Sequence, residues 1–294
     1  MPTLTLSVPA EFSFDAGLRY LARSPRESQH RVEDGRVKKV IDAGGLPVLL
    51  EVHAPEPNQL TIDYQTTSTN PELFVRNYVT EWFDLARDLR PFYALAKLDP
   101  LLGPAVEQNY GLRLIGIPNL FEALCWAIIG QQINLAFAYT LKQRFVQTLG
   151  VQSTYAGVPY YRFPTAEAVA RIRPDQLTAR QFSTRKAEYV IGVAQAIVEG
   201  RISKQQLSAL PTAEAQETLI RQRGVGAWTA HYVLLKCLQR PDAFPAADVG
   251  LHNAIRQGLS LPHKPDLAAV HRYAEPWQGW RGYATFYLWQ TLLP

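Results

Sequence analysis

The sequence predicts an α+β protein: a small N-terminal antiparallel β-sheet with helices over residues 1–112, followed by an all-α part over residues 113–294. Three observations predict this fold class. Strand-like runs separated by turn signals occupy the first 70 residues. From residue 113 onward, apolar residues recur at helical spacing and the connections are short. The charge divides at the same place, since residues 1–112 hold 11 Lys and Arg against 15 Asp and Glu, whereas residues 113–294 hold 19 against 11.

The composition is that of a folded protein with a hydrophobic core, because 47% of the residues are apolar and 19% are charged. No apolar stretch is long enough to cross a bilayer, and the start MPTLTLSVPAEF lacks the basic and apolar regions of a signal peptide. Cys125 and Cys237 have no C-x-x-C or H-x-x-x-H companion, so we expect no metal site. The basic excess after residue 112 favours a polyanionic partner, although an ordinary solvated surface would also account for it.

The N-terminal third is expected to fold as a sheet backed by one or two helices. Turn signals at Asp34-Gly35, Gly44-Gly45 and Pro57-Asn58 separate its strands. In the last strand-like run Leu60, Ile62 and Tyr64 alternate with polar residues, which is typical of a strand with one buried face. The expected elements are a helix at 14–23, strands within 30–42, 46–54 and 58–66, and a helix at 71–89 opened by Asn70 as N-cap and Pro71. No residue pattern here indicates chemistry, so we expect a structural role.

The remaining chain is expected to form helices with recognisable caps. Residues 119–150 are apolar on nearly all sides, which predicts a buried central helix or a pair of helices. Further helices are predicted within 165–172, 182–200 and 212–222. The predicted N-caps are Asn119, with Glu122 completing a capping box, then Thr165, Ser183 or Thr184, and Thr212; Gly150 and Gly200 stand where C-terminal glycines belong.

The stretch RGVGAWTAHY, residues 223–232, predicts a tight turn between two helices. Gly224 and Gly226 permit backbone conformations and close approaches that other residues block. The free N–H groups at the start of the second helix would favour an anion such as a DNA phosphate. For Gly-x-Gly alone, an ordinary helix–helix loop with a C-terminal glycine is the better explanation.

The residues around this turn indicate that it is part of a binding site. Trp228 and Tyr232 lie on one helix face at positions i and i+4, and Asp248 in FPAADVGL follows a loop and opens another helix. The segment YAEPWQGWRGYATFYLWQ adds more aromatic residues near the C-terminus, and five of the six tryptophans lie in the basic region. Aromatic faces, a cationic surface and one acid together suggest a pocket for a flat base, including a cationic one.

Taken together, these segments resemble the helix-hairpin-helix DNA glycosylase superfamily, and within it the DNA-3-methyladenine glycosylase II branch. FEALCWAIIGQQINLAFA is similar to the central helix of that family, GVGAWTAHY to its hairpin (about residues 213–239 with both helices), and FPAADVGL to its catalytic segment. YAEPWQGWRGYATFYLW is similar to its terminal aromatic helix, and the N-terminal sheet to the extra domain of this branch. Each piece is common alone, but their order and spacing are specific.

The resemblance implies a monofunctional DNA glycosylase of base excision repair that acts on alkylated purines. Asp248 takes the position of the catalytic aspartate, which stabilises the sugar cation and orients the attacking water. A helix-opening Asp is more often only an N-cap, and the two roles are compatible. Trp228, Tyr232 and Trp289 match the residues that stack on the flipped base. Trp228 occupies the place where lyase-competent relatives carry a nucleophilic lysine, so no lyase activity is expected.

The resemblance also implies DNA contacts and leaves some positions open. Trp277 and Trp280 are expected in the core rather than the pocket. The expected DNA-binding residues are Gly224, Gly226, Arg223 and Thr229 of the hairpin, with Gln131 or Gln132 as the wedge that fills the gap left by the flipped nucleotide. The sequence departs from the family where Gln222-Arg223 replace an apolar residue and proline, and where Ala247 stands in place of an acid that is often seen beside the catalytic aspartate.

The expected partner is double-stranded DNA with damaged bases, bound by a monomer that is cytoplasmic and associated with the chromosome. No cofactor is expected, and the four cysteines of iron–sulfur relatives are missing near the C-terminus; hairpins of this family can also hold a monovalent cation on backbone carbonyls. Two other hypotheses remain open. One is a non-catalytic or weakly catalytic binder of damaged or bent DNA, and the other is an unrelated helical enzyme with a coincidental Gly-x-Gly and no affinity for DNA.

Overall fold

The computed structural model describes residues 1–293, and its N-terminal part is a five-stranded antiparallel sheet in the order β1-β5-β4-β3-β2. The strands are β1 Thr3–Ser7, β2 His30–Glu33, β3 Arg36–Ala43, β4 Leu46–His53 and β5 Gln59–Thr66. Leu60, Ile62 and Tyr64 are buried, as the alternation predicts. Strand β1 was not predicted, because a run of five residues gives a weak signal and its pairing with β5 is a long-range contact.

The helices around the sheet differ in part from the expected ones. Helix α1 Phe14–Leu21 forms as expected, whereas α2 spans only Glu72–Trp82, and Pro71 rather than Asn70 stands at its N-cap without a side-chain hydrogen bond. The helix stops early because Asp84 adopts a positive φ of 46° and turns into a buried polar network. Two short helices, α3 Arg90–Ala96 and α4 Leu102–Gln108, then lead into the second part of the chain.

The long apolar segment forms a pair of helices rather than one. Helix α5 Leu120–Gly130 begins at Asn119, whose side chain accepts the backbone N–H of Glu122, and α6 Leu135–Leu149 begins at Asn134. Gln132 adopts a left-handed conformation between them, with φ of 57°. The later helices are α7 Ala166–Ala170, α8 Pro174–Thr178, α9 Thr184–Val198, α10 Lys204–Ala209, α11 Thr212–Ile220, α12 Ala227–Lys236, α13 Val249–Gly258, α14 Leu267–Ala274 and α15 Arg281–Gln290, with a 3₁₀ turn at Glu275–Trp277. Thr165 and Ser183 cap as predicted, while Thr212 is the first residue of α11 rather than its cap.

The second part is not entirely helical, because residues 151–162 form an antiparallel hairpin of β6 Val151–Tyr155 and β7 Val158–Arg162. The hairpin packs on the sheet, where Tyr160 joins Val40 and Leu49 in a small buried cluster. Arg162 also forms an ion pair with Asp42. These strands were missed because their burial comes from the distant sheet and not from neighbours in the sequence.

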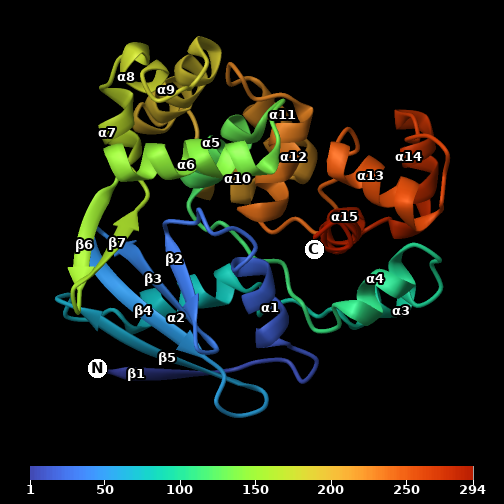
Figure 1. Cartoon of the computed structure of the whole chain (residues 1–294), viewed down its shortest axis with the longest axis horizontal. Coiled ribbons are helices and arrows are strands. Elements are labelled where there is room, and N and C mark those ends of the chain that lie inside the picture. The colour runs from blue at the N-terminus through green and yellow to red at the C-terminus, as the bar shows by residue number, and fades with distance from the viewer. Residues whose placement is uncertain (294) are drawn as a thin grey trace.

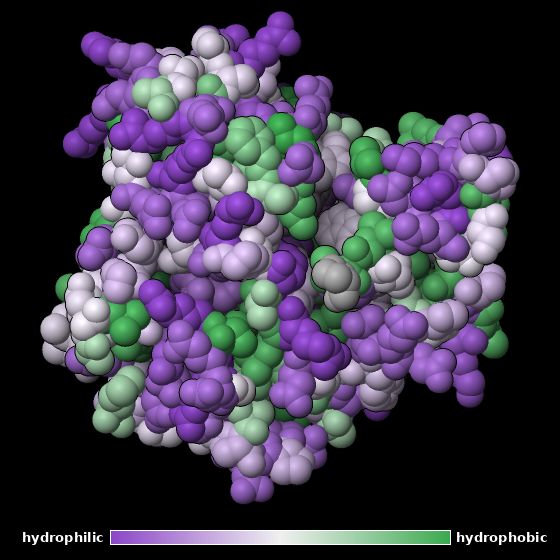
Figure 2. Space-filling view, viewed as in Figure 1, coloured by the Kyte–Doolittle hydropathy of each residue, from purple (hydrophilic) through white to green (hydrophobic). Residues whose placement is uncertain are grey.

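The two parts share one continuous hydrophobic core, which contains residues of the sheet and of the helices. Figure 1 shows α5, α6, α11 and α12 on one side of the helical part and α13, α14 and α15 on the other. Figure 2 shows a mainly hydrophilic face that is hollowed between these two groups. Within residues 1–293, no helix has the length and apolar character needed to cross a membrane.

Candidate active site

The turn between α11 and α12 needs its two glycines for different reasons. Gly224 has a φ of +88°, and a Cβ placed there would lie 2.2 Å from the ring of Tyr189, so only glycine fits. Gly226 has an ordinary φ of −89°, and a Cβ there would meet nothing within 4 Å. Gly226 is the N-cap of α12 but supplies no side-chain acceptor, so the first amides of the helix stay available to an outside anion.

The end of α5 holds this turn in place. The side-chain amide of Gln131 donates to the carbonyl oxygen of Gly224 and to the hydroxyl of Thr229, each at 2.9 Å. Thr229 is buried and its hydroxyl faces Gln131, so an expected DNA contact at this residue would have to come from its backbone. Gln132, the other expected wedge residue, is exposed.

Arg223 lies on the surface beside the turn. Its guanidinium forms an ion pair with Glu188 at 2.9 Å and lies 5.8 Å from the centre of the Tyr189 ring. The side chain is 77% exposed, so the cation remains accessible even though one carboxylate already pairs with it.

Asp248 is the N-cap of α13 and also receives two indole N–H groups. Its Oδ1 accepts the backbone N–H of Leu251 at 2.7 Å and the indole N–H of Trp289 at 2.8 Å. Its Oδ2 accepts the indole N–H of Trp228 at 2.8 Å. Three donors from α12, α13 and α15 therefore fix the orientation of one partly exposed carboxylate, which is a stronger arrangement than a helix cap needs.

Gly250 makes this arrangement possible and was not singled out from the sequence. A Cβ at this position would lie 2.9 Å from Asp248 Oδ1 and 3.2 Å from the Trp289 ring. A glycine two residues after a helix-opening Asp indicates that another group packs closely against the helix backbone there. The sequence does not show which side chain this group is.

The expected aromatic residues form a continuous stack next to the carboxylate. The rings of Trp228 and Tyr232 are 5.6 Å apart and nearly parallel at 29°, and those of Tyr232 and Trp289 are 6.2 Å apart at 31°. Trp228 and Trp289 are half-buried, while Tyr232 is buried, which raises its pKa. The structure thus brings together Asp248, Trp228, Tyr232 and Trp289, which come from three separate segments.

Two other tryptophans are used in packing, Trp277 within the core and Trp280, which is half-buried, against it. Trp277 is fully buried and donates its indole N–H to Asp99 at 2.7 Å. Trp280 packs against Phe92, with ring centres 5.7 Å apart. Neither residue contacts Asp248.

Comparison with known proteins identifies the family of this chain. Residues 125–278, which include the hairpin, Trp228, Tyr232 and Asp248 but end before Trp289, match the family described as "HhH-GPD superfamily base excision DNA repair protein". The chain belongs to this superfamily. The match covers more than half of the chain and confirms the resemblance found in the sequence.

Members of the superfamily and related structures match the chain over different lengths. The N-terminal residues 29–124 match the family described as "8-oxoguanine DNA glycosylase, N-terminal domain". The chain is 41% identical to a DNA-3-methyladenine glycosylase of Bacillus subtilis over 98% of this chain and 97% of that protein. The structure of a 3-methyladenine DNA glycosylase from Archaeoglobus fulgidus has a TM-score of 0.86 at 23% identity and covers 98% and 97% of the two chains. That of Schizosaccharomyces pombe 3-methyladenine DNA glycosylase in complex with abasic DNA has a TM-score of 0.55 at 26% identity and covers 67% and 93%.

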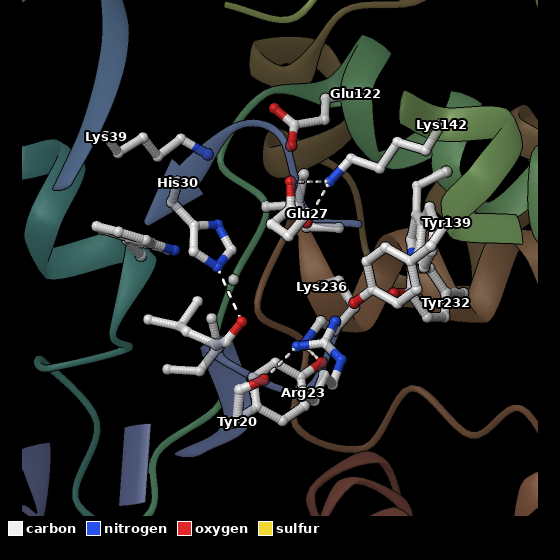
Figure 3. A pocket seen from close by; sticks show the side chains of 16 residues that line it. Tyr20, Arg23, Glu27, His30, Lys39, Glu122, Tyr139, Lys142, Tyr232 and Lys236 are labelled. Atoms are coloured by element: carbon white, nitrogen blue, oxygen red, sulfur yellow. Dashed lines mark hydrogen bonds and ion pairs between the residues drawn. The ribbon is translucent and has the colours of Figure 1, made fainter. Parts of the chain in front are cut away.

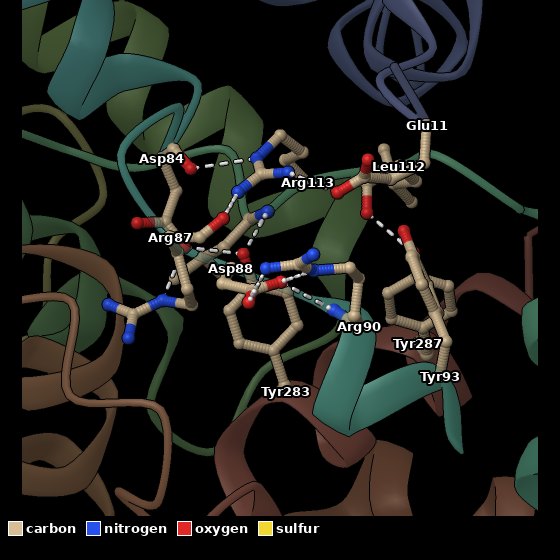
Figure 4. A network of polar contacts seen from close by, with 11 residues as sticks. Glu11, Asp84, Arg87, Asp88, Arg90, Tyr93, Leu112, Arg113, Tyr283 and Tyr287 are labelled. Atoms are coloured by element: carbon tan, nitrogen blue, oxygen red, sulfur yellow. Dashed lines mark hydrogen bonds and ion pairs between the residues drawn. The ribbon is translucent and has the colours of Figure 1, made fainter. Parts of the chain in front are cut away.

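In this member of the superfamily, a buried polar network anchors α15, the helix that carries Trp289. The hydroxyl of Tyr283 donates to the Asp84 carboxylate and accepts the backbone N–H of Leu114 at 3.1 Å (Figure 4). Arg113 is buried and donates to the carbonyl oxygen of Asp84 at 2.8 Å. Burial raises the pKa of Asp84. The network links α15 to the N-terminal part, and so it supports the position of Trp289 from behind.

The polar residues do not form a recognisable metal centre. Among residues 1–293, no group of three or more His, Cys, Asp and Glu side chains is placed to hold a metal ion. Cys125 and Cys237 are both buried and free, and burial raises the pKa of each thiol.

Proposed function

We propose that this chain is a monofunctional DNA glycosylase of base excision repair, which flips an alkylated purine out of duplex DNA and hydrolyses its N-glycosidic bond with Asp248. Purines of the 3-methyladenine and 7-methylguanine type are the proposed substrates. The carboxylate held by the indole N–H groups of Trp228 and Trp289, beside an aromatic stack, carries this proposal. The near full-length similarity to the Bacillus subtilis enzyme supports it.

Asp248 acts on the sugar. The bond between C1′ and the base nitrogen breaks with its electron pair leaving on the base, so a cationic alkylated base departs as a neutral molecule. The carboxylate stabilises the sugar cation that remains. A water molecule then adds through its oxygen to C1′ and gives one proton to Asp248. The three donors to Asp248 keep both oxygens in a fixed place while this charge develops.

The aromatic stack acts on the base. Trp228, Tyr232 and Trp289 offer electron-rich faces to a flat ring, and these faces attract a base made cationic by N3- or N7-alkylation. Such a base is already a good leaving group, so no general acid needs to protonate it. An indole cannot form a Schiff base, so Trp228 cannot act as the nucleophile of a lyase reaction. The product is therefore an abasic site in an unbroken DNA strand.

The hairpin and its surroundings act on the DNA backbone. The amides that follow Gly226 would hold a phosphate, and Arg223 adds an exposed cation. We assign the wedge to Gln132, because Gln131 is used to hold the turn. A monovalent cation on hairpin carbonyls is compatible with this role. A monomer suffices, since one chain supplies both pocket and hairpin, and we propose that it works on the chromosome in the cytoplasm.

The decisive experiment compares base release from methylated duplex DNA by wild type and Asp248→Asn, with chromatography of the freed bases. We expect the wild type to release methylpurines and the variant to lose at least about 100-fold in single-turnover rate, because the main charge opposite the sugar cation is removed. Unchanged melting temperature and DNA affinity would show that the variant is folded. A folded wild type that binds DNA tightly but releases no base from a panel of lesions would instead identify a non-catalytic binder of damaged or bent DNA.

A further inference from the structure

A second set of residues follows the aromatic stack deeper into the protein. Trp228, Tyr232 and Lys236 occupy positions i, i+4 and i+8 of α12, so they lie on one face of the helix. Trp228 contacts Asp248, whereas Tyr232 and Lys236 line a cavity of about 50 Å³ between α12, α6 and the segment that follows α1 (Figure 3). The cavity therefore adjoins the proposed base pocket through the ring of Tyr232.

Lys236 is a buried ammonium without a carboxylate partner. The side chain is only 2% exposed, and its Nζ lies 3.2 Å from the hydroxyl of Tyr20. The rings of Tyr20 and Phe286 lie 4.9 and 4.8 Å from Nζ. Among the ion pairs of residues 1–293, none includes Lys236, and burial lowers its pKa.

Arg23 brings a second cation to the same place from the N-terminal part. Its guanidinium lies 3.7 Å from the centre of the Tyr20 ring and 5.7 Å from that of Tyr139, and one of its five N–H groups donates to the carbonyl oxygen of Tyr20 at 2.7 Å. Figure 3 shows Arg23 beside Lys236 and close to Tyr139. Arg23 likewise has no ion-pair partner within residues 1–293.

Glu27 lines the same cavity, but its charge is already neutralised. Glu27 pairs with Lys142 at 2.8 Å, and the two side chains are only 8% and 11% exposed. The end of the cavity next to Tyr232 therefore offers N–H donors and two cations, with the tyrosine hydroxyls as its remaining polar groups. Lys236 and Arg23 each have one hydrogen bond to Tyr20 and carry further N–H groups, so this end of the cavity favours a ligand that brings an acceptor.

We propose that Lys236 and Arg23 are specificity-determining residues that favour a flipped purine with a carbonyl oxygen at C6, such as 7-methylguanine, over one with an amino group there, such as 3-methyladenine. In this proposal the sugar end of the base lies at Asp248, which contacts Trp228 at the start of α12, and the opposite edge points along the same helix face toward Lys236. An oxygen at C6 accepts from these donors, whereas an amino group meets them with donors of its own.

The two cations also favour the reaction of such a base and not only its binding. As the glycosidic bond breaks, the base gains an electron pair, and part of that charge reaches the C6 oxygen. A cation at this edge therefore stabilises the transition state more than it stabilises the bound substrate, because the alkylated ring of the bound substrate is still positive. The effect should therefore be seen in the rate of base release. This inference rests on the proposed glycosylase function.

The test measures single-turnover release of 7-methylguanine and of 3-methyladenine from the same methylated duplex DNA, and compares the ratio of the two rates. We expect Lys236→Met and Arg23→Met each to lower this ratio roughly tenfold, as expected when a charge-assisted hydrogen bond is lost. Lys236→Arg should keep the ratio, because it retains a cationic donor. Arg26→Met is the matched control, since Arg26 is exposed on the same segment as Arg23.

Melting temperatures show whether each variant is folded, and Arg23→Met tests the proposal separately if Lys236→Met does not fold. Equal losses for both bases would mean that the residues serve the structure alone and would overturn the inference while leaving the proposed function intact. A wild type that releases neither base would overturn the proposed function itself, and this inference with it.

Discussion

At the scale of single residues, Asp248 shows how one side chain can serve the helix and the site together. Its Oδ1 caps α13 through Leu251 and also accepts the indole N–H of Trp289, while Oδ2 accepts that of Trp228. The cap places the carboxylate at the start of the helix, and the two indoles select its rotamer. Stability and proposed chemistry therefore depend on the same atoms.

The first prediction concerns the indole N–H of Trp289. Trp289→Phe keeps an aromatic ring in the stack but removes the donor to Asp248 Oδ1. We expect single-turnover base release to fall about tenfold, because the carboxylate loses one charge-assisted hydrogen bond and part of its orientation. Rapid-quench measurement of base release checks this.

Trp280→Phe is the matched control, because Trp280 packs against Phe92 and has no contact with Asp248. DNA affinity, measured separately by fluorescence anisotropy, should stay close to wild type in both variants. An equal rate loss in both variants would argue against a positioning role for Trp289.

The directions of individual side chains could not be predicted from the sequence. Thr229 belongs to the predicted hairpin, yet its hydroxyl faces Gln131 in the interior. Gln131 and Gln132 are adjacent and identical in type, but only the backbone at Gln132 is left-handed, which sends the second side chain outward. Neither outcome can be read from the spacing of residues along a helix.

At the scale of elements, the turn between α11 and α12 separates two roles of glycine. Gly224 is required by its positive φ and by the ring of Tyr189, whereas Gly226 has free space around its α-carbon. The first is therefore a requirement of the fold, and the second is available for an approach from outside.

The second prediction uses this difference. Gly224→Ala should destabilise the protein by about 2 kcal/mol or more, because it combines backbone strain with a clash at Tyr189. Gly226→Ala should change stability by less than about 1 kcal/mol but weaken binding to duplex DNA at moderate salt, because its methyl group would lie at the proposed phosphate site.

Urea unfolding and salt-dependent binding assays measure the two effects. If Gly226→Ala bound DNA as tightly as wild type over the whole salt range, the hairpin would not be the phosphate site.

Element boundaries were predicted well where caps are local and poorly where distant contacts decide. Asn119 and Ser183 open their helices as expected. Helix α2, in contrast, ends at Trp82 because Asp84 turns inward to Tyr283, which lies 199 residues further along the chain. Strands β6 and β7 likewise owe their burial to β3 and β4.

At the scale of the whole molecule, the N-terminal part packs directly behind the proposed site. It supplies Arg23 and Tyr20 to the cavity behind the stack, and Asp84 to the network behind α15. The sequence offered no sign of this contribution, because these residues lie far from the hairpin in the chain.

The third prediction tests the junction between the two parts through pH. Burial, with help from nearby Lys39 and Lys142, lowers the pKa of His30 to about 4, although Glu27 acts in the opposite direction. Between this value and the ordinary 6.5, the unfolded chain binds the proton and the folded chain does not. The contribution of His30 to the free energy of unfolding is therefore fully present above pH 6.5 and is lost as the pH falls toward 4.

Urea unfolding at pH 7 and pH 4.5 measures this change. We expect His30→Gln to reduce the loss of unfolding free energy between the two pH values by about 2 kcal/mol. His263→Gln is the matched control, because His263 is exposed and lies outside the junction. Identical pH dependence in wild type and His30→Gln would contradict the prediction.

The sequence by itself determined the fold class, most helices and strands, the hairpin, and the superfamily, because periodicity, caps and turn residues act over a few positions. It also selected Asp248, Trp228, Tyr232 and Trp289. Only the tertiary structure showed that both indoles bind the one carboxylate across 20 and 41 residues of chain, and that Arg23 meets Lys236 behind the stack. Such contacts depend on how distant segments pack, and local sequence patterns carry no information about that packing.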